Sequence, residues 1–204
     1  MDETPFESIP ETIDILFEGY SKRPELLDSL ETIKTVSSII IEHTINVLIV
    51  TFRYCFFHNL SEQETKRLAL CALLHDIGTS IVEKSIIDSD HRLTDEEYKA
   101  YTTHTSKGCD LLFKQTSFDP LVSTVAQEHH ERIDGSGYPY GRTNISYESQ
   151  LIGLIDCYEP LTYRDKTYRK VKEPFDSLKI IKEEVIQGKF QKDLFKKLCS
   201  CLGA

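Results

Sequence analysis

The hydrophobic and polar positions of this chain repeat with a helical period almost throughout. From about Leu26 onward, apolar residues recur three or four positions apart, which is the spacing of one buried helical face. No segment alternates clearly between apolar and polar residues, as half-buried strands do, and there is no internal repeat. The sequence therefore predicts an all-α fold of about seven helices. Their expected ranges are 28–58, 62–76, 95–115, 120–131, 147–163, 175–187 and 191–202.

Local signals mark where several of these helices begin. Ser61–Glu64 and Thr94–Glu97 both have the capping-box pattern, in which a Ser or Thr is followed three residues later by Glu. Asp119 precedes Pro120, a pair that suits an N-cap followed by proline in the first turn. Residues 132–146 instead gather glycine, proline and small polar residues, so a loop is expected there.

The first residues of the chain differ from the rest. Residues 1–20 contain six acidic residues and no Lys or Arg, and prolines at positions 5 and 10 interrupt them. We expect an acidic, solvated lead-in over residues 1–27, with an acidic docking segment as the alternative. The remaining residues, 28–204, are expected to form one domain, since this length suits a single core.

Composition and charge exclude several classes of protein. The chain has 204 residues, 40% of them hydrophobic, and a formal net charge of −9. This acidic balance argues against DNA or general nucleic-acid binding, which needs a basic surface. Within residues 36–60, the longest stretch without a charged residue runs from His43 to Phe52, so a buried helix is expected and no membrane span. No signal-peptide pattern opens the chain, and a cytoplasmic protein is expected.

Cysteines are scattered and form no Cys-x-x-Cys pair. We therefore expect reduced, mostly buried thiols, with redox or metal roles as the alternative. The six positions are Cys55, Cys71, Cys109, Cys157, Cys199 and Cys201.

Histidines and aspartates carry the chemistry. Each lies in an apolar helical pattern or at a helix end, where an unpaired polar group would be costly to bury. A single such histidine is usually a hydrogen-bonded core residue, but the set of seven favours metal binding. Nitrogen and oxygen donors without thiolate suit Fe, Mn, Zn or Ni, and seven ligands fit two ions that share Asp76. The set is His43, His75, Asp76, His104, His129, His130 and Asp156.

Several motifs resemble the HD-GYP family over about residues 35–190. They are Leu73–Gly78 (LLHDIG), His104–Gly108 (HTSKG), His129–Pro139 (HHERIDGSGYP), and Asp156–Thr162 (DCYEPLT) with Lys166–Arg169 (KTYR). The resemblance implies a helical HD-superfamily domain that hydrolyses cyclic di-GMP to pGpG or GMP through a metal-bridging hydroxide. It also implies two divalent ions, iron or manganese first and zinc or nickel as alternatives.

By position, the resemblance assigns His43, His75, Asp76 and Asp156 to the first metal. Asp76 would bridge to a second metal held by His104, His129 and His130. The position of a third-metal glutamate in some members is Ile39 here, which cannot ligate, so a binuclear site is implied. The catalytic set is His75, Asp76, Glu131 and Asp134. Glu131 is expected to orient a ligand histidine, with a solvated or capping carboxylate as the alternative.

The resemblance also suggests substrate contacts. Residues 163–172 are rich in Lys and Arg, which by itself is typical of a solvated face. Beside Asp156, this run is expected to bind the substrate phosphates, while the glycine-rich segment forms a rigid lip for guanine or a protein partner. The expected substrate residues are Arg164, Lys166, Arg169, Glu159, Gly137 and Tyr138.

Departures from the family pattern affect the substrate side. Thr79 stands where the family usually has a lysine, Glu159 replaces an aspartate, and Pro160 and Ile133 also differ from the usual residues. The main hypothesis is a cyclic di-GMP phosphodiesterase that turns over slowly. The alternatives are a slow or inactive receptor or adaptor for a cyclic dinucleotide, and an HD phosphohydrolase of another nucleotide. A cyclase or sensor protein is a further expected partner, and a homodimer is a further expected state.

Overall fold

The computed structural model describes residues 9–22, 39–114, 118–162 and 172–203. The described residues form helices and loops, and no strand occurs among them, which confirms the all-α prediction. The elements are α1 (Ile9–Lys22), α3 (Ile39–Phe57), α4 (Glu62–Leu74), the 3₁₀ helix η2 (Ile77–Ile81), α5 (Lys84–Ile87), α6 (Asp95–Phe113), α7 (Pro120–Glu128), α8 (Tyr147–Thr162), α9 (Pro174–Ile186) and α10 (Lys192–Leu202).

Local sequence signals set the helix starts as predicted. The hydroxyls of Ser61 and Thr94 each accept a hydrogen bond from the backbone N–H of the glutamate three residues later. The carboxylate of that glutamate accepts one from the backbone N–H of the Ser or Thr, so both capping boxes form. Asp119 caps α7, with Pro120 in its first turn. Helix α7 ends at Glu128, earlier than predicted, and this leaves the two following histidines at its C-terminal end.

Helix α1 corrects one prediction. The segment expected to be a solvated lead-in is helical from Ile9, and Ile13 is buried in the core. The side chain of Phe17 packs against Phe56 of α3, with ring centroids 5.5 Å apart. The acidic residues and prolines hid a real helical pattern, because Pro10 lies in the first turn, where it is tolerated. The 27/28 boundary stays a prediction, since residues 23–38 lie outside the described part.

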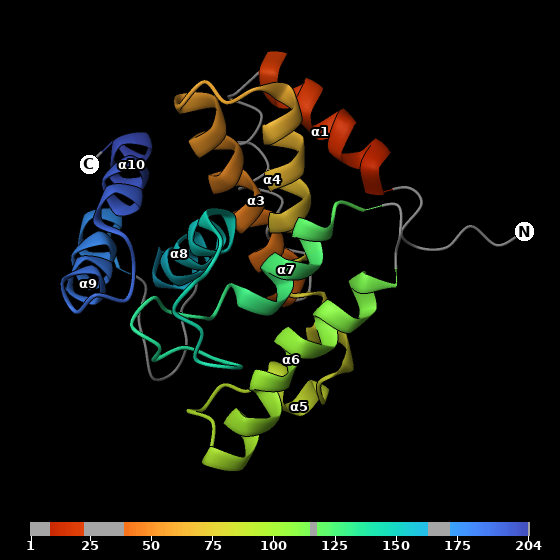
Figure 1. The fold of residues 1–204 in the computed structure, drawn as a ribbon, viewed down its shortest axis with the longest axis vertical. Coiled ribbons are helices and arrows are strands. Elements are labelled where there is room, and N and C mark those ends of the chain that lie inside the picture. The colour runs from red at the N-terminus through yellow and green to blue at the C-terminus, as the bar shows by residue number, and fades with distance from the viewer. Residues whose placement is uncertain (1–8, 23–38, 115–117, 163–171, 204) are drawn as a thin grey trace, which may run out of the picture.

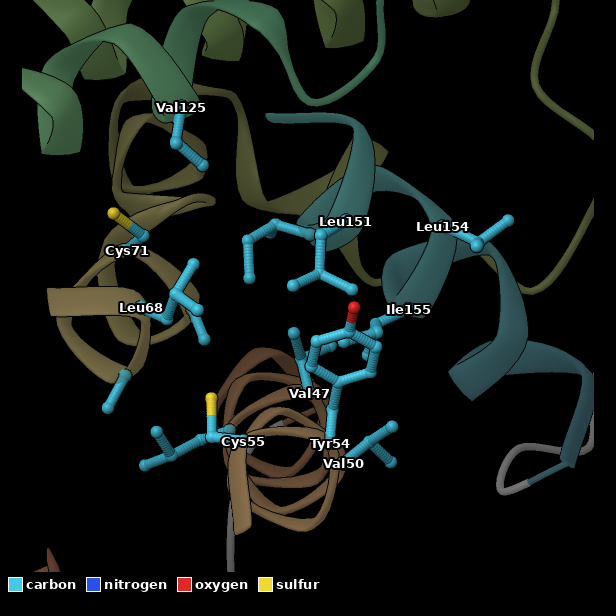
Figure 2. Packing of buried hydrophobic residues seen from close by; sticks show 14 of the residues in the cluster. Val47, Val50, Tyr54, Cys55, Leu68, Cys71, Val125, Leu151, Leu154 and Ile155 are labelled. Atoms are coloured by element: carbon cyan, nitrogen blue, oxygen red, sulfur yellow. The ribbon is translucent and has the colours of Figure 1, made fainter. Parts of the chain in front are cut away.

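The core forms around α8. This helix contacts α3, α4, α7 and α9, while α6 lies beside α7 and η2 (Figure 1). Figure 2 shows side chains from α3, α4, α7 and α8 meeting in one cluster. Burial of aliphatic and aromatic groups drives this packing. The labelled residues are Val47, Val50, Tyr54, Cys55, Leu68, Cys71, Val125, Leu151, Leu154 and Ile155.

Helix α3 passes a length and composition test for a membrane span over Ile40–Phe57. Half of that window is buried inside the protein, and core helices of water-soluble proteins pass the same test. Val47 and Tyr54 are fully packed by neighbouring helices, as the buried-helix prediction requires.

The cysteines are free thiols, as predicted. Three are buried and three are half-buried, and burial raises the thiol pKa of Cys55 and of Cys201 to about 12. Neutral thiols are therefore expected at physiological pH.

Candidate metal centre

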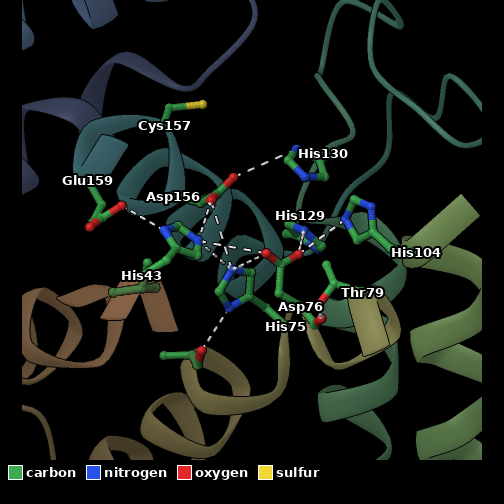
Figure 3. A network of polar contacts seen from close by, with 12 residues as sticks. His43, His75, Asp76, Thr79, His104, His129, His130, Asp156, Cys157 and Glu159 are labelled. Carbon is green, nitrogen blue, oxygen red and sulfur yellow. Dashed lines mark hydrogen bonds and ion pairs between the residues drawn. The ribbon is translucent and has the colours of Figure 1, made fainter. Parts of the chain in front are cut away.

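Five helices deliver side chains to one point in the molecule. His75 and Asp76 follow the end of α4, and His129 and His130 follow the end of α7 (Figure 3). The remaining residues are His43 on α3, His104 on α6 and Asp156 on α8. The seven residues predicted from the sequence are thus brought together.

Two glycines let the helices approach closely enough for this. A Cβ at Gly78 would lie 2.0 Å from the carbonyl oxygen of His104, so only glycine allows η2 to contact α6 there. A Cβ at Gly153 would lie 2.1 Å from the carbonyl oxygen of His129. Larger residues at these positions would separate Asp76 from His104, or α7 from α8.

One half of the cluster surrounds the Oδ2 atom of Asp76. This oxygen lies 3.8 Å from Nε2 of His43 and 3.8 Å from Nε2 of His75. Oδ1 of Asp156 lies 3.1 Å from the same nitrogen of His43 and 3.9 Å from that of His75. Two imidazoles and two carboxylates therefore face a common space.

The other half surrounds the Oδ1 atom of Asp76. It lies 3.2 Å from Nε2 of His104 and 3.5 Å from Nε2 of His129. His130 completes this group, in which the potential ligand atoms all lie within 4.8 Å of one another. Nδ1 of His130 also lies 3.7 Å from Oδ2 of Asp156. Asp76 is common to both halves, one carboxylate oxygen in each.

Backbone carbonyls fix how three of the histidines present their second nitrogen. Nδ1 of His75 donates to Ala72 O at 2.7 Å, and Nδ1 of His104 donates to Tyr101 O at 2.7 Å. His129 Nδ1 donates to Val125 O at 3.1 Å. A carbonyl can only accept, so Nδ1 carries the proton and Nε2 keeps its lone pair when the ring is neutral. That lone pair is what a metal needs.

Burial and charge oppose each other in the cluster. Burial lowers the pKa of His75 to about 4, which keeps its ring neutral. Burial would raise the pKa of Asp76, but the nearby His75 and His104 outweigh it and hold that pKa well below its usual value. For His43, burial alone would lower the pKa. The hydrogen bonds and negative charges of Asp156 and Glu159 together raise it by more, so the net shift is upward.

The donor set fits divalent metals. Buried polar atoms are almost always hydrogen-bonded, yet Asp76 Oδ1, His104 Nε2 and His129 Nε2 are buried without a hydrogen-bond partner. All three point into the same space and are metal-ligand atoms. Imidazole nitrogens and carboxylate oxygens suit first-row transition metals.

We expect metal to stabilise the folded protein. Protein stripped of metal by a chelator should gain about 2.7 kcal/mol of unfolding free energy when the free metal concentration is raised to about 100 times the dissociation constant. For a chain of this size, that corresponds to a rise in melting temperature of about 5–10 °C. Thermal melts with and without Mn²⁺ measure it, with the Asp76→Asn variant as control. Equal melting temperatures for native metal-free and metal-loaded protein would contradict a buried metal centre.

Glu159 lies behind His43, on the side of that ring away from Asp76. Its Oε2 accepts a hydrogen bond from Nδ1 of His43 at 2.6 Å, and its Oε1 accepts one from Asn46 Nδ2 at 2.6 Å. Both carboxylate oxygens are thereby used, which corrects the prediction of a substrate contact. Glu159 follows Asp156 by three residues and Asn46 follows His43 by three, so each pair shares a helical face. That spacing was the signal available in the sequence.

Glu131 and Asp134 also differ from expectation. The oxygens of Glu131 accept hydrogen bonds from the backbone N–H of Tyr140, at 2.8 Å, and of Arg142, at 3.0 Å, rather than from a ligand histidine. Asp134 is exposed and accepts from the backbone and hydroxyl of Ser136, in a local turn of the loop. Both residues shape the loop after α7, and neither reaches the cluster.

A further buried carboxylate, Glu128 at the end of α7, was not identified from the sequence. Glu128 accepts hydrogen bonds from Arg142 Nη1 at 3.0 Å and from Ser149 Oγ at 3.1 Å. With Glu131, it fastens residues 140–149 to the end of α7. The sequence carries no local signal for this, because the partners lie 14 and 21 residues away.

Tyr138 covers the second half of the cluster. Its ring stacks on His130 with centroids 4.6 Å apart, and its N–H donates to His130 O at 3.2 Å. A Cβ at Gly137 would lie 2.4 Å from that same carbonyl oxygen, so the loop follows the histidine backbone closely. The predicted lip therefore lies directly beside the cluster.

Thr79 is buried beside Asp76 (Figure 3). Its hydroxyl donates to the Asp76 carbonyl at 2.7 Å, within the 3₁₀ turn that follows Asp76. Residues three apart align in a 3₁₀ helix, so Thr79 and Asp76 lie on the same side of this turn. Arg164, Lys166 and Arg169 lie outside the described residues.

Comparison with known proteins identifies similar chains. A family model described as HD domain matches residues 32–194. A cyclic di-GMP phosphodiesterase of Pseudomonas aeruginosa is 28% identical over 94% of this chain and 46% of its own length. A 3'3'-cGAMP-specific phosphodiesterase of Vibrio cholerae is 31% identical over 70% of this chain and 31% of its own length. The chain thus spans about half or less of these two curated relatives.

Solved structures share the fold. An HDG"Y"P protein from Bdellovibrio bacteriovorus gives a TM-score of 0.74 at 17% identity, covering 97% of this chain and 62% of its own. The HD domain of the phosphodiesterase PgpH from L. monocytogenes, in complex with cyclic-di-AMP, gives 0.58 at 14% identity, covering 79% and 87% of the two chains. At these identities the likeness concerns the fold.

Proposed function

Because the chain belongs to the HD domain family, we propose that it is a metal-dependent phosphodiesterase that hydrolyses cyclic di-GMP to pGpG or GMP. The observation that carries this proposal is the pair of ligand groups that share Asp76. The names of the relatives support cyclic dinucleotides as the substrate class. A single carboxylate placed between two sets of histidines is the arrangement that a two-metal hydrolase needs.

The chain's own residues would act by holding and orienting. We assign His43, His75 and Asp156 to one metal, His104, His129 and His130 to the other, and Asp76 to both. When bound, two divalent ions would activate water and neutralise charge on the phosphate. The buried histidines are already oriented by their backbone hydrogen bonds, so little rearrangement would accompany binding. Iron or manganese is the proposed metal, and zinc or nickel the alternative.

A direct test is hydrolysis by metal-reconstituted protein. Protein purified without oxygen is analysed for metal, then incubated with cyclic di-GMP, 3'3'-cGAMP and cyclic di-AMP, and the products are separated by chromatography. We expect about two metal ions per chain and linear product from cyclic di-GMP. Binding without turnover would favour the receptor alternative. Hydrolysis of another nucleotide but not of cyclic di-GMP would favour the alternative of an HD phosphohydrolase with a different substrate.

Thr79 is the feature that favours slow turnover. We expect Thr79→Lys to raise the single-turnover rate about 10-fold, the lower end for a charge-assisted hydrogen bond worth about 1.5–3 kcal/mol. A threonine hydroxyl is neutral, and here it is used by the Asp76 carbonyl. Single-turnover kinetics and metal content measure the effect.

A matched change is available for this test. Lys84 is exposed and its ammonium lies 3.9 Å from Asp88, so Lys84→Thr should leave the rate unchanged. If Thr79→Lys keeps its metals and is no faster, another residue supplies the positive charge, and Arg164 is the next to change. We also propose that the protein is cytoplasmic, that it binds a cyclase or sensor protein, and that it forms a homodimer.

A further inference from the structure

A row of aromatic side chains runs along one face of α6 toward the candidate metal centre. Tyr98 and Tyr101 are three residues apart, as are Tyr101 and His104, so each pair is adjacent on the helix surface. The ring of Tyr101 lies 4.7 Å from that of His104. The ring of Tyr98 lies 6.0 Å from that of Tyr138, at an interplanar angle of 81°. Helix α6 and the loop after α7 therefore meet through tyrosines.

This aromatic row is continuous with the predicted metal ligands. Tyr138 contacts Tyr98 on one side and stacks on His130 on the other, at 4.6 Å and 26°. His130 in turn lies against His104, with centroids 5.1 Å apart. Tyr98 is therefore separated from the cluster residue His130 by the single ring of Tyr138.

Tyr98 is exposed in a way that the core does not explain. Half of its surface is accessible to solvent, whereas Tyr101 and Tyr138 are partly buried. An edge-to-face contact with Tyr138 fixes the ring without covering both of its faces. An aromatic face held at the rim of a polar centre is suited to stack on another flat ring.

We propose that Tyr98 stacks on a purine base of the substrate and, with Tyr138, forms the base-binding wall of the site. This inference rests on the proposed function, since it takes a cyclic dinucleotide as the ligand. Every base offers a π-face, so stacking supplies affinity without reading the base. Tyr98 would therefore serve guanine and adenine alike, and selection between them would fall to other groups.

The test compares dissociation constants of metal-loaded variants for phosphorothioate analogues of the cyclic dinucleotides, which resist hydrolysis, by equilibrium dialysis. We expect Tyr98→Ala to weaken binding of cyclic di-GMP about 10-fold, within the range of about 5- to 140-fold for loss of one base stack. Binding of 3'3'-cGAMP should weaken by a similar factor. Tyr98→Phe keeps the ring and should bind like the native protein. Phe113→Ala is the control, because Phe113 is an 80% exposed aromatic residue at the other end of α6.

Inorganic phosphate separates base binding from the metal centre. As a competitive inhibitor it lacks a base, so its inhibition constant should be the same for native protein and Tyr98→Ala. A matching rise in that constant would mean that Tyr98 supports the metal site, and the proposal would be wrong. Unchanged binding of both nucleotides by Tyr98→Ala would also overturn it, while leaving the proposed function intact.

A fluorescent variant gives a readout that does not depend on turnover. The chain has no tryptophan, so Tyr98→Trp would place a single indole at the proposed contact. Stacking of a base is expected to quench its emission on addition of cyclic di-GMP, and inorganic phosphate should not. Quenching without hydrolysis would uphold base stacking and reject the proposed activity. Hydrolysis without quenching would reject base stacking alone, and native protein that binds no cyclic dinucleotide would reject both.

Discussion

Asp76→Asn is expected to remove metal from both halves of the centre at once and to reduce hydrolysis of cyclic di-GMP to about 1% of native or less. Each carboxylate oxygen of Asp76 faces a different pair of histidines, at 3.2–3.5 Å for one oxygen and 3.8 Å for the other. An amide keeps the shape but presents a single neutral oxygen, so one half loses its shared ligand outright. The loss of charge weakens the other half as well.

Metal analysis and initial rates together measure this expected result. Asp110→Asn is the matched control, because Asp110 is an exposed aspartate on α6. It should keep native metal content and rate. If Asp76→Asn loses one metal and keeps the other at native affinity, Asp76 is a ligand of one half only. Retention of both metals and of full activity would reject the shared-ligand arrangement.

The convergence of the seven cluster residues could be predicted because their sequence context is unusual. His75, Asp76 and Asp156 lie in or beside strongly apolar runs, where an unpaired polar group is costly. The starts of α4, α6 and α7 were also predictable, since N-capping residues act within one turn. The helix ranges predicted from apolar periodicity then placed each cluster histidine on a specific helix. These are signals that local sequence carries.

The direction in which a carboxylate points was not predictable in the same way. Glu131 directly follows two cluster histidines, yet its partners are backbone amides nine and eleven residues later. Any residue type except proline can supply such an amide, so the sequence offers no partner to recognise. Helix α1 escaped for a related reason: Phe17 finds its partner Phe56 far along the chain.

Glu159 shows how a correct residue can receive the wrong role. It was selected because it belongs to the closing motif, and the structure places it at the cluster, but behind His43. The His43 ring lies between Glu159 and Asp76. Its Nδ1 binds the Glu159 carboxylate, and its Nε2 points toward the metal space. A carboxylate behind a ligand histidine fixes its tautomer and increases its basicity.

Glu159→Ala is accordingly expected to weaken metal binding in the His43 half by about 100-fold, and Glu159→Gln by about 10-fold. Glutamine can still accept from Nδ1 of His43, so it keeps the ring orientation and loses the charge. Asn46 can turn its amide to accommodate the new NH₂ group. Metal titration should therefore show one weakened site, while the site formed by His104, His129 and His130 keeps its native affinity.

The control for this change is Glu148→Gln on the same helix. Glu148 forms an ion pair with Arg67 at 3.3 Å near the surface, and such pairs contribute about 0–1 kcal/mol. It should therefore leave both metal affinities unchanged. A purely structural role for Glu159 would weaken both sites together and lower the melting temperature of the metal-free protein. Selective loss at the His43 half, graded from Gln to Ala, is the result that a positioning carboxylate requires.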